Sequence, residues 1–295
     1  MIDVLLATYK PNPAWLQAQI ASIQRNAVNL KFDFRSDLKS NFAQGDVVNL
    51  ICREDAEGRG ACQNFAALLD ESRAEYVAFS DQDDVWLDDK LSRALAKMHE
   101  LESRYGKKTP LLVFADARVV NANLNPIADS LFAHTKIDPS RTLPRQLALQ
   151  NVANGNTMLF NAALRDLARP IPAGAFMHDH WVMLVASAFG HIACLREPAL
   201  LYRQHSQNVL GGAKVGFCYF LCRALQGRAV LRERLYGNIR QVEAFVKRFG
   251  DSSPACFKAL VGLREKPYPV RVYTLLRHRV FKNGLIRNLG TLAIV

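Results

Sequence analysis

The chain has 295 residues, of which 49% are hydrophobic and 22% are charged, and its formal net charge is +11. This is the balance of a globular protein with one large domain, or with one domain and an appendage. No uninterrupted apolar segment approaches the roughly 20 residues of a membrane-spanning helix, and the N-terminal stretch "MIDVLLATYK" lacks the basic region of a signal peptide. Six cysteines without a CxxC pair or a Cys/His cluster at zinc spacing favour a reducing compartment.

The positive charge is concentrated in the last part of the chain. Residues 1–212 contain 22 Lys and Arg against 23 Asp and Glu, whereas residues 213–295 contain 16 against 4. The composition changes at Gly211 and Gly212, in the stretch "LGGAKVG". We therefore expect a neutral domain over residues 1–212 and a basic extension over residues 213–295.

Short apolar segments alternate with segments of helical periodicity along the neutral part. The apolar segments are rich in β-branched residues and predict buried strands at 2–8, 47–53, 76–80 and 111–120. Apolar residues at helical spacing predict helices at 13–26, 61–72 and 86–105, the first of them capped by Asn12. This alternation predicts an α/β fold in which helices cover both faces of a parallel sheet.

Three aspartates, Asp81, Asp83 and Asp84, follow the predicted strand 76–80 at its carboxyl end. Open α/β sheets bind their ligands at this end. Carboxylates this close repel one another unless a cation shares them, and oxygen ligands suit Mg²⁺ or Mn²⁺. Such an ion neutralises the charge that grows on a departing diphosphate. The alternative is helix capping by Asp84 for a helix that begins near Trp86, but capping does not account for Asp81.

Four motifs, in order along residues 1–212, resemble those of family 2 glycosyltransferases. They are "VLLATY" in the first strand, "FSDQDDVW" around the aspartates, "MHDHW" at 177–181 and "LYRQHSQNVLGGA" at 201–213. More narrowly, they resemble the bacterial rhamnosyltransferase-like subgroup, which extends O-antigen, capsule or exopolysaccharide chains. The resemblance implies a GT-A fold, which is a Rossmann-like αβα sandwich with a mostly parallel central sheet. It also implies a nucleotide-diphosphate sugar as donor, a divalent metal ion and inversion of the anomeric centre.

The resemblance assigns roles to the acidic residues. Asp81 and Asp83 match the DxD motif, so we expect both at the metal ion and Asp81 also at the ribose of the nucleotide. Asp84 matches an additional acid of the subgroup. Asp179 matches the catalytic base, which takes the proton of an acceptor hydroxyl as that hydroxyl attacks C1 of the sugar. An acidic helix cap is the alternative role for Asp179, and the two roles are compatible.

Further residues are expected around the donor. Thr8 and Tyr9 match the end of the first strand, which lines the nucleotide pocket. Arg203 and His205 lie on one face if "LYRQH" is extended, and we expect both at the donor diphosphate, with His205 also a candidate ligand of the metal. The family carries "DDGS" after its second strand, whereas this chain has "LKFDFRSDLKS". Asp33, Ser36 and Asp37 are the remnants of that motif, and we expect Asp33 at the nucleotide.

Several neighbouring residues have both a structural and a functional interpretation. His178 and His180 flank the expected base, but alternate positions at a helix start point apart, which argues against a shared zinc ion. Asn154 and Asn156 in "NGNTMLFN" are candidates for the acceptor site or for a turn. Trp181 is expected either in the core or as a platform under a sugar ring.

Two segments of the extension, 220–249 and 267–289, combine apolar residues at helical spacing with many arginines. The apolar positions of the first segment are Leu221, Leu225, Leu231, Leu235, Ile239, Val242 and Val246. Such helices suit an anionic membrane surface, to which an acceptor on polyprenyl diphosphate would bring the protein. The alternative is a helical layer packed on the domain. Nucleic acid is not an expected partner, because no RNA motif or recognition helix accompanies the charge.

These features lead to two functional hypotheses. The first is an inverting glycosyltransferase, peripheral on the cytoplasmic face of a bacterial membrane, that moves a sugar such as rhamnose to a lipid-linked or growing glycan. The second is a GT-A-fold protein without turnover that binds sugar or nucleotide in a polysaccharide assembly complex. Asp83 and Asp179 together favour the enzyme, because a binding protein has no use for a base. A nucleotidyltransferase would need a Gly-rich basic loop after the first strand, and "ATYKPNP" is not one.

Overall fold

The computed structural model describes residues 1–26, 31–36, 47–55, 58–205 and 228–295. The chain separates into two compact units. The first consists of Met1–Leu131, Ala153–Ile171 and Met177–Gly211, and the second of Phe132–Val152, Pro172–Phe176 and Gly212–Val295. The boundary predicted between residues 212 and 213 lies outside the described residues and stays a prediction.

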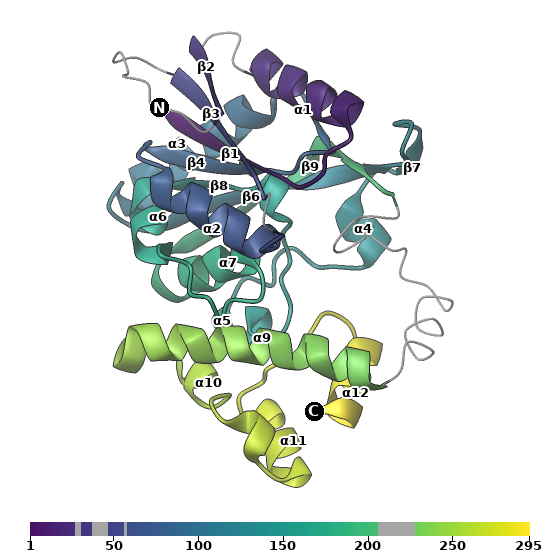
Figure 1. Ribbon diagram of the computed structural model, residues 1–295. Coiled ribbons are helices and arrows are strands. Elements are labelled where there is room, and N and C mark those ends of the chain that lie inside the picture. Colours follow the sequence, from purple (N-terminus) through teal and green to yellow (C-terminus); the bar gives the residue numbers. More distant parts are fainter. Residues whose placement is uncertain (27–30, 37–46, 56–57, 206–227) are drawn as a thin grey trace. The chain divides into compact units, whose positions relative to one another are not determined.

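The first unit is built on a nine-stranded sheet (Figure 1). Its first half is parallel and consists of β2 (Lys31–Ser36), β3 (Val47–Glu54), β1 (Ile2–Thr8) and β4 (Tyr76–Ser80), in that spatial order. The sheet continues through β8 (Leu159–Asn161), β6 (Leu111–Val120), β9 (His191–Arg203) and β5 (Val85–Trp86), and β7 (Pro126–Ala128) pairs with β6. β6 and β9 are parallel, whereas β8 is antiparallel to β4 and β6.

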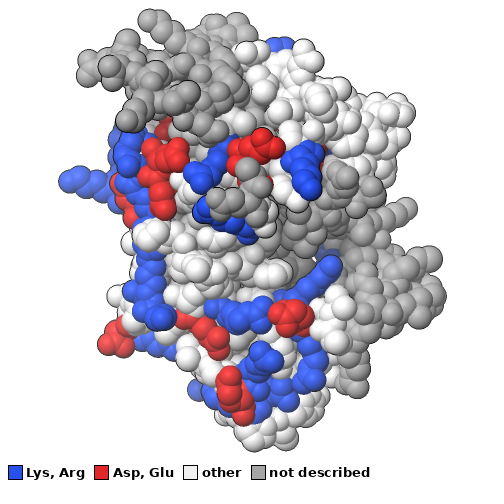
Figure 2. All heavy atoms as spheres, viewed as in Figure 1, with Lys and Arg blue, Asp and Glu red and all other residues white. Residues whose placement is uncertain are grey.

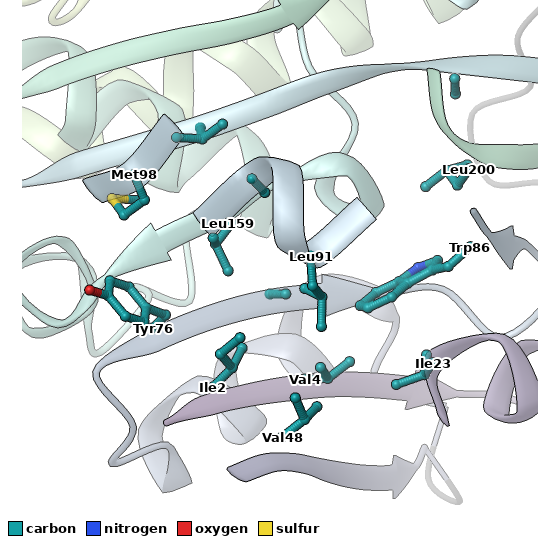
Figure 3. Close-up of a cluster of buried hydrophobic side chains, with 14 of the residues drawn as sticks. Ile2, Val4, Ile23, Val48, Tyr76, Trp86, Leu91, Met98, Leu159 and Leu200 are labelled. Atoms are coloured by element: carbon teal, nitrogen blue, oxygen red, sulfur yellow. The ribbon is translucent and has the colours of Figure 1, made fainter. Parts of the chain in front are cut away.

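Helices cover both faces of this sheet. α1 (Pro13–Asn26) and α3 (Lys90–Tyr105) pack on one face, where Ile23 and Leu91 join Val4 in a buried apolar cluster (Figure 3). α2 (Ala61–Glu71) packs on the other face, because Phe65 contacts Phe79, whose sequence neighbour Ala78 belongs to the first cluster. α7 (His178–Phe189) contacts α2 and α6 (Ala162–Ala168). The predicted α/β fold, with helices on both faces of a central sheet, is confirmed.

The boundaries of α1, α2 and α3 follow the predictions to within one residue, except at the start of α3. The Asn12 side-chain oxygen accepts hydrogen bonds from the backbone N–H groups of Ala14 and Trp15, so its predicted capping of α1 is confirmed. The helix predicted from residue 86 begins instead at Lys90. Trp86 belongs to β5, which pairs with the end of β9 in an antiparallel arrangement. A pairing with a strand more than a hundred positions away thus overrides the local helical pattern.

The second unit is helical and basic. Its longer helices are α9 (Arg228–Phe249), α11 (Tyr268–Arg277) and α12 (Leu285–Ile294), and shorter turns include α5 (Pro144–Leu147) and α10 (Ala255–Lys258). The face seen in Figure 2 carries more Lys and Arg than Asp and Glu. Leu221 and Leu225 of the predicted amphipathic pattern lie outside the described residues. In the parts of the chain that the structure describes, no helix is long and apolar enough to cross a membrane.

Candidate active site

The aspartate loop, residues 81–84, connects β4 to β5 at the carboxyl end of the parallel strands. Asp84 is fully buried, while Asp81 and Asp83 are partly buried. β4 itself is buried over its whole length, which fixes the start of the loop. The aspartates therefore lie at the edge where α/β sheets bind ligands, as the sequence predicts.

Asp84 is the anchor of the loop. One carboxylate oxygen accepts a 2.9 Å hydrogen bond from the backbone N–H of Arg203, and the other accepts one from the Asn156 side-chain amide. Burial, and next the Asp83 and Asp81 carboxylates, raise the pKa of Asp84 well above its usual range. The alternative in which Asp84 caps the following helix is wrong, because α3 begins at Lys90 and the Asp84 oxygens point to other elements.

Asp83 pairs with His205. The Nε2 atom of His205 lies 2.6 Å from the Asp83 Oδ2 atom, and both side chains are largely buried. The His205 ring also contacts the Trp15 ring, with centroids 4.8 Å apart, so α1 contributes to its placement. At this distance the imidazole and the carboxylate are hydrogen-bonded to each other, and their binding of a metal ion stays a prediction.

The third carboxylate of the loop is that of Asp81. Burial first, then the Asp83 and Asp179 carboxylates, raise its pKa to about 7, against a smaller opposing effect of Lys90. The influence of Asp179 matters here, because that residue lies nearly a hundred positions further along the chain. Asp81, Asp83 and Asp179 thus share one electrostatic environment, where a cation would lower the mutual repulsion.

Asp179 stands in the first turn of α7. Its Oδ2 atom accepts a 3.2 Å hydrogen bond from the backbone N–H of Gly155, and its Oδ1 atom accepts a 2.6 Å bond from the N–H of His180. Gly155 approaches closely, since a Cβ atom there would lie 3.1 Å from Cβ of Asp179 and 3.0 Å from the ring of His178. The helix start therefore holds the carboxylate in place. The N-cap position of α7 is Met177, so Asp179 is not the cap of the helix, and its role as a base stays a prediction.

Arg203 supports the loop from the end of β9. Its Nε atom donates a 2.6 Å hydrogen bond to the carbonyl oxygen of Asp83, and Nη1 donates to that of Ala122. The guanidinium also lies 5.0 Å from the centre of the Trp15 ring. Burial lowers the pKa of Arg203, although nearby Asp84 and Asp83 act in the opposite direction. These contacts place Arg203 beside the aspartates and give its side chain a structural role there; contact with a diphosphate stays a prediction.

The end of β1 is tied to the aspartate loop by Gln82. Its side-chain oxygen accepts a 2.7 Å hydrogen bond from the Tyr9 backbone N–H, and its amide donates a 3.2 Å bond to the Tyr9 carbonyl. Thr8 is buried and donates to the carbonyl oxygen of Arg53. Asp33 lies on β2 opposite Asn49 of β3. Nucleotide contacts of Thr8, Tyr9 and Asp33 stay predictions.

The structural interpretation holds for two residues near Asp179. Trp181 is fully buried, and its indole N–H donates to the carbonyl oxygen of Ala168, so it is a core residue and no sugar platform. His178 is buried between the rings of Phe65 and Phe79, at centroid distances of 3.9 and 4.8 Å. Burial lowers the pKa of His178 to about 3, so the imidazole is neutral at physiological pH. Neither ring nitrogen of His178 has a hydrogen-bond partner among the described residues.

Sequence reasoning missed Lys90 and Gln82 as parts of the site. Lys90 is buried with its Nζ atom 3.4 Å from the centre of the Trp86 ring. Burial lowers the pKa of Lys90 to about 7, and Asp84 and Asp81 oppose that shift. The signal was present, because a lysine among the first residues of a predicted helix is unusual near its positive end. Gln82 gave no such signal, since it lies between two more conspicuous acids.

Among the described residues, no group of three or more His, Cys, Asp or Glu side chains is arranged to hold a metal ion. The carboxylates of Asp83 and Asp81 still fit the way in which Mg²⁺ binds in proteins. That ion takes one or two carboxylates and completes its coordination with water and substrate phosphates.

Comparison with known proteins gives relatives of low identity. No protein-family model matches the chain. The chain is similar to the dTDP-rhamnosyl transferase RfbG of Shigella flexneri, with 23% identity over 244 residues that cover 72% of this chain and 75% of the relative. This similarity confirms the predicted resemblance to rhamnosyltransferase-like family 2 glycosyltransferases.

Solved structures of TarS from S. aureus align with this chain. Residues 1–349 of TarS in complex with UDP-GlcNAc align at a TM-score of 0.49 and 16% identity, covering 94% of this chain and 80% of that chain. A second TarS structure aligns at a TM-score of 0.46 and 15% identity, covering 94% of this chain and 48% of that one.

Proposed function

We propose that this protein is a metal-dependent inverting glycosyltransferase that moves a sugar from a nucleotide diphosphate to a glycan acceptor in bacterial surface polysaccharide synthesis. Rhamnose is the first candidate sugar, because the relative from Shigella flexneri is a dTDP-rhamnosyl transferase. The observation that carries the proposal is the shared electrostatic environment of Asp81, Asp83 and Asp179, which would bring a cation and a carboxylate base together.

Asp83 and His205 would hold the divalent ion, with Asp81 beside them. When bound, Mg²⁺ or Mn²⁺ would neutralise the diphosphate charge that grows as the sugar leaves. The carbonyl oxygen of Asp83 is fixed by the Arg203 guanidinium, and Asp84 is fixed by the Arg203 N–H. These bonds keep the loop in one position and spare the substrate the cost of ordering it.

Asp179 is the proposed base. In one displacement, the bond from C1 of the sugar to the diphosphate oxygen breaks while a bond from C1 to the acceptor oxygen forms. The acceptor proton passes to the Asp179 carboxylate, and the bonding electron pair leaves with the diphosphate. The N–H groups of Gly155 and His180 orient that carboxylate. Cys62 also lies near it, since Asp179, after burial, contributes to raising the pKa of the Cys62 thiol to about 12.

The acceptor is proposed to be lipid-linked or a growing glycan, so that the protein works as a peripheral protein on the cytoplasmic face of the membrane. The second unit supports this, because residues 213–295 carry 16 Lys and Arg against 4 Asp and Glu. Anionic lipid attracts such a segment. We propose no nucleic-acid partner, since the charge comes without a nucleic-acid recognition motif.

The test is a screen of UDP-, GDP- and dTDP-sugars for stabilisation that depends on Mn²⁺ or Mg²⁺, followed by turnover with the best donor. Asp179→Asn is expected to lower turnover by about a thousandfold while donor binding, measured by calorimetry, stays within about twofold of the unaltered protein. A fully active Asn variant would refute the assignment of the base. Donor binding without any turnover, in both proteins, would favour the alternative of a binding partner in an assembly complex.

A further inference from the structure

Helix α12 has an inverted distribution of side chains. Leu285, Ile286 and Leu289 are exposed to 73%, 56% and 57% of their surface, whereas Thr291 is buried and Arg287 is half-buried. Residues 285, 286 and 289 lie on one side of a helix, so the aliphatic side chains form a continuous outward stripe. A helix that packs on a core normally buries such a stripe.

The inward side of α12 is held by polar contacts. The Arg287 guanidinium donates hydrogen bonds to the carbonyl oxygens of Thr135 and Lys136 in the same unit. The Asn288 side chain pairs with the backbone of Lys282, accepting from its N–H and donating to its carbonyl oxygen. These bonds fix the orientation of the helix, so the exposure of its aliphatic side is a property of the fold.

Helix α11 adds to the same kind of surface. Tyr273 and Leu276 are exposed to 63% and 48%, and the hydroxyl of Tyr268 donates to the carbonyl oxygen of Leu292 near the end of α12. The long basic helix α9 behaves in the opposite way, since it buries its apolar positions inside the unit. Those buried positions are Leu235, Ile239, Val242 and Phe245. The exposed apolar surface of the second unit is therefore concentrated on α11 and α12.

The charge around α11 and α12 has one sign. Residues 266–295 contain Lys266, Arg271, Arg277, Arg279, Lys282 and Arg287 and no Asp or Glu. Arg277 and Arg279 are exposed. A second copy of the chain would bring cations against cations in a two-fold symmetric contact, which is unfavourable. An anionic lipid bilayer offers both the negative charge and the apolar interior that this surface lacks.

We propose that α11 and α12 form the membrane-binding surface of this protein, with Leu285, Ile286 and Leu289 inserted among the acyl chains of an anionic bilayer and Arg277 and Arg279 at the headgroups. This inference deepens the proposed function, since it locates the contact through which a lipid-linked acceptor would be reached. It also assigns α9, the longer and more obvious amphipathic helix, to the interior of the second unit.

The experiment is co-sedimentation of the full chain with vesicles of phosphatidylcholine alone and of phosphatidylcholine mixed with phosphatidylglycerol. We expect binding to the mixed vesicles only. Leu285→Ser combined with Leu289→Ser should weaken that binding by about tenfold or more at both low and high salt, because inserted apolar surface is lost. Arg277→Gln combined with Arg279→Gln should weaken it at low salt by about fivefold for each cation removed, and much less at high salt.

The matched control is Val230→Ser combined with Val261→Ser, which removes exposed apolar side chains outside α11 and α12 in the same unit. We expect this control to bind vesicles like the unaltered protein. A tryptophan in place of Ile286 provides a second readout, because its fluorescence should shift to shorter wavelength when mixed vesicles are added. Thermal unfolding shows whether each variant is folded, so that a binding loss is not mistaken for unfolding.

Two outcomes would overturn the inference. One is unchanged vesicle binding by the Leu285→Ser, Leu289→Ser protein together with an unshifted tryptophan spectrum. The other is a dimer in light scattering that the same leucine substitutions convert to a monomer, which would make the surface a contact between two copies. Vesicle binding is measured without donor or acceptor. A chain that binds vesicles as expected but transfers no sugar would therefore refute the proposed function and leave this inference standing.

Discussion

The aspartate loop of the first unit and helix α12 of the second unit use their side chains in opposite ways. In the loop, charged groups are buried and held by partners from distant segments, as with Asp84 and Arg203. In α12, apolar groups are exposed and the polar ones face inward. Each arrangement costs stability in an isolated protein in water. We propose that a partner outside the chain offsets each cost, a cation at the loop and an apolar phase at α12.

The largest expected effect separates two neighbouring acids of the loop. Asp83→Asn removes a proposed metal ligand, so we expect kcat/KM to fall by about a thousandfold and metal-dependent donor binding to be lost. Asp84→Asn removes only a support, and its expected loss is about tenfold or less. Calorimetry with donor at varied Mn²⁺ measures both. An equal fall in kcat/KM for the two variants would contradict the assignment of Asp83 as a metal ligand and of Asp84 as a structural support.

The next effect concerns stability. Asp84→Ala leaves the Arg203 N–H and the Asn156 amide without their buried acceptor, and we expect the free energy of unfolding to fall by about 3 kcal/mol. Asp84→Asn should cost about 1 kcal/mol or less, because the Asn156 side chain can turn its unpartnered oxygen towards the new amide. Urea unfolding compares the two proteins. A similar loss in both variants would mean that the charge of Asp84, and not its hydrogen bonds, anchors the loop.

Acid sensitivity tests the cost of burying His178. Its pKa falls from 6.5 to about 3 through burial, so the folded protein binds fewer protons than the unfolded chain between these values. The free energy of unfolding is therefore highest above pH 6.5, the unfolded pKa of His178, and decreases as the pH falls towards 3. We expect a loss of about 2 kcal/mol at about pH 5 relative to about pH 8. His178→Phe should remove this part of the pH dependence, and an unchanged difference between the two pH values would argue against a buried neutral imidazole.

The smallest expected effect tests the link between β1 and the loop. Gln82→Ala removes both hydrogen bonds to the Tyr9 backbone, and because Gln82 is only partly buried we expect donor affinity to fall by about fivefold. Turnover at saturating donor should change less than KM, since Gln82 positions the pocket and takes no part in the chemistry. Gln17→Ala, an exposed glutamine on α1, is the matched control. A loss of the same size in the control would show that the link is not specific.

Much of the fold was predictable because its signals are local. The buried strands β1, β3, β4 and β6 are short apolar runs, and Asn12 caps α1 through its own neighbours. The start of α3 was not predictable in this way. The local pattern places Trp86 at the start of a helix, whereas in the structure it pairs with β9. The antiparallel β8 was missed for the same reason, since its pairing with β4 and β6 lies outside any local pattern.

For the site, the sequence and the resemblance brought together residues that the fold also brings together. Asp83 and His205 are paired, and Asp179 influences the carboxyl of Asp81. The sequence did not show which aspartate of the loop has a structural role. Asp84 faces the interior because Asn156 and Arg203 bind its carboxylate there. The sequence alone does not distinguish it from Asp81 and Asp83.

The hydrogen bond between Asp84 and Arg203 also bears on the order in which parts of the protein fold during synthesis. It joins residues 119 positions apart, and the Asp83–His205 pair joins residues 122 positions apart. A chain emerging from the ribosome exposes its aspartates long before β9 exists to receive them, and non-local contacts of this kind form late. A nascent chain therefore carries the aspartates before the residues that hold them are made, and the loop reaches its final arrangement only after β9 has joined the sheet.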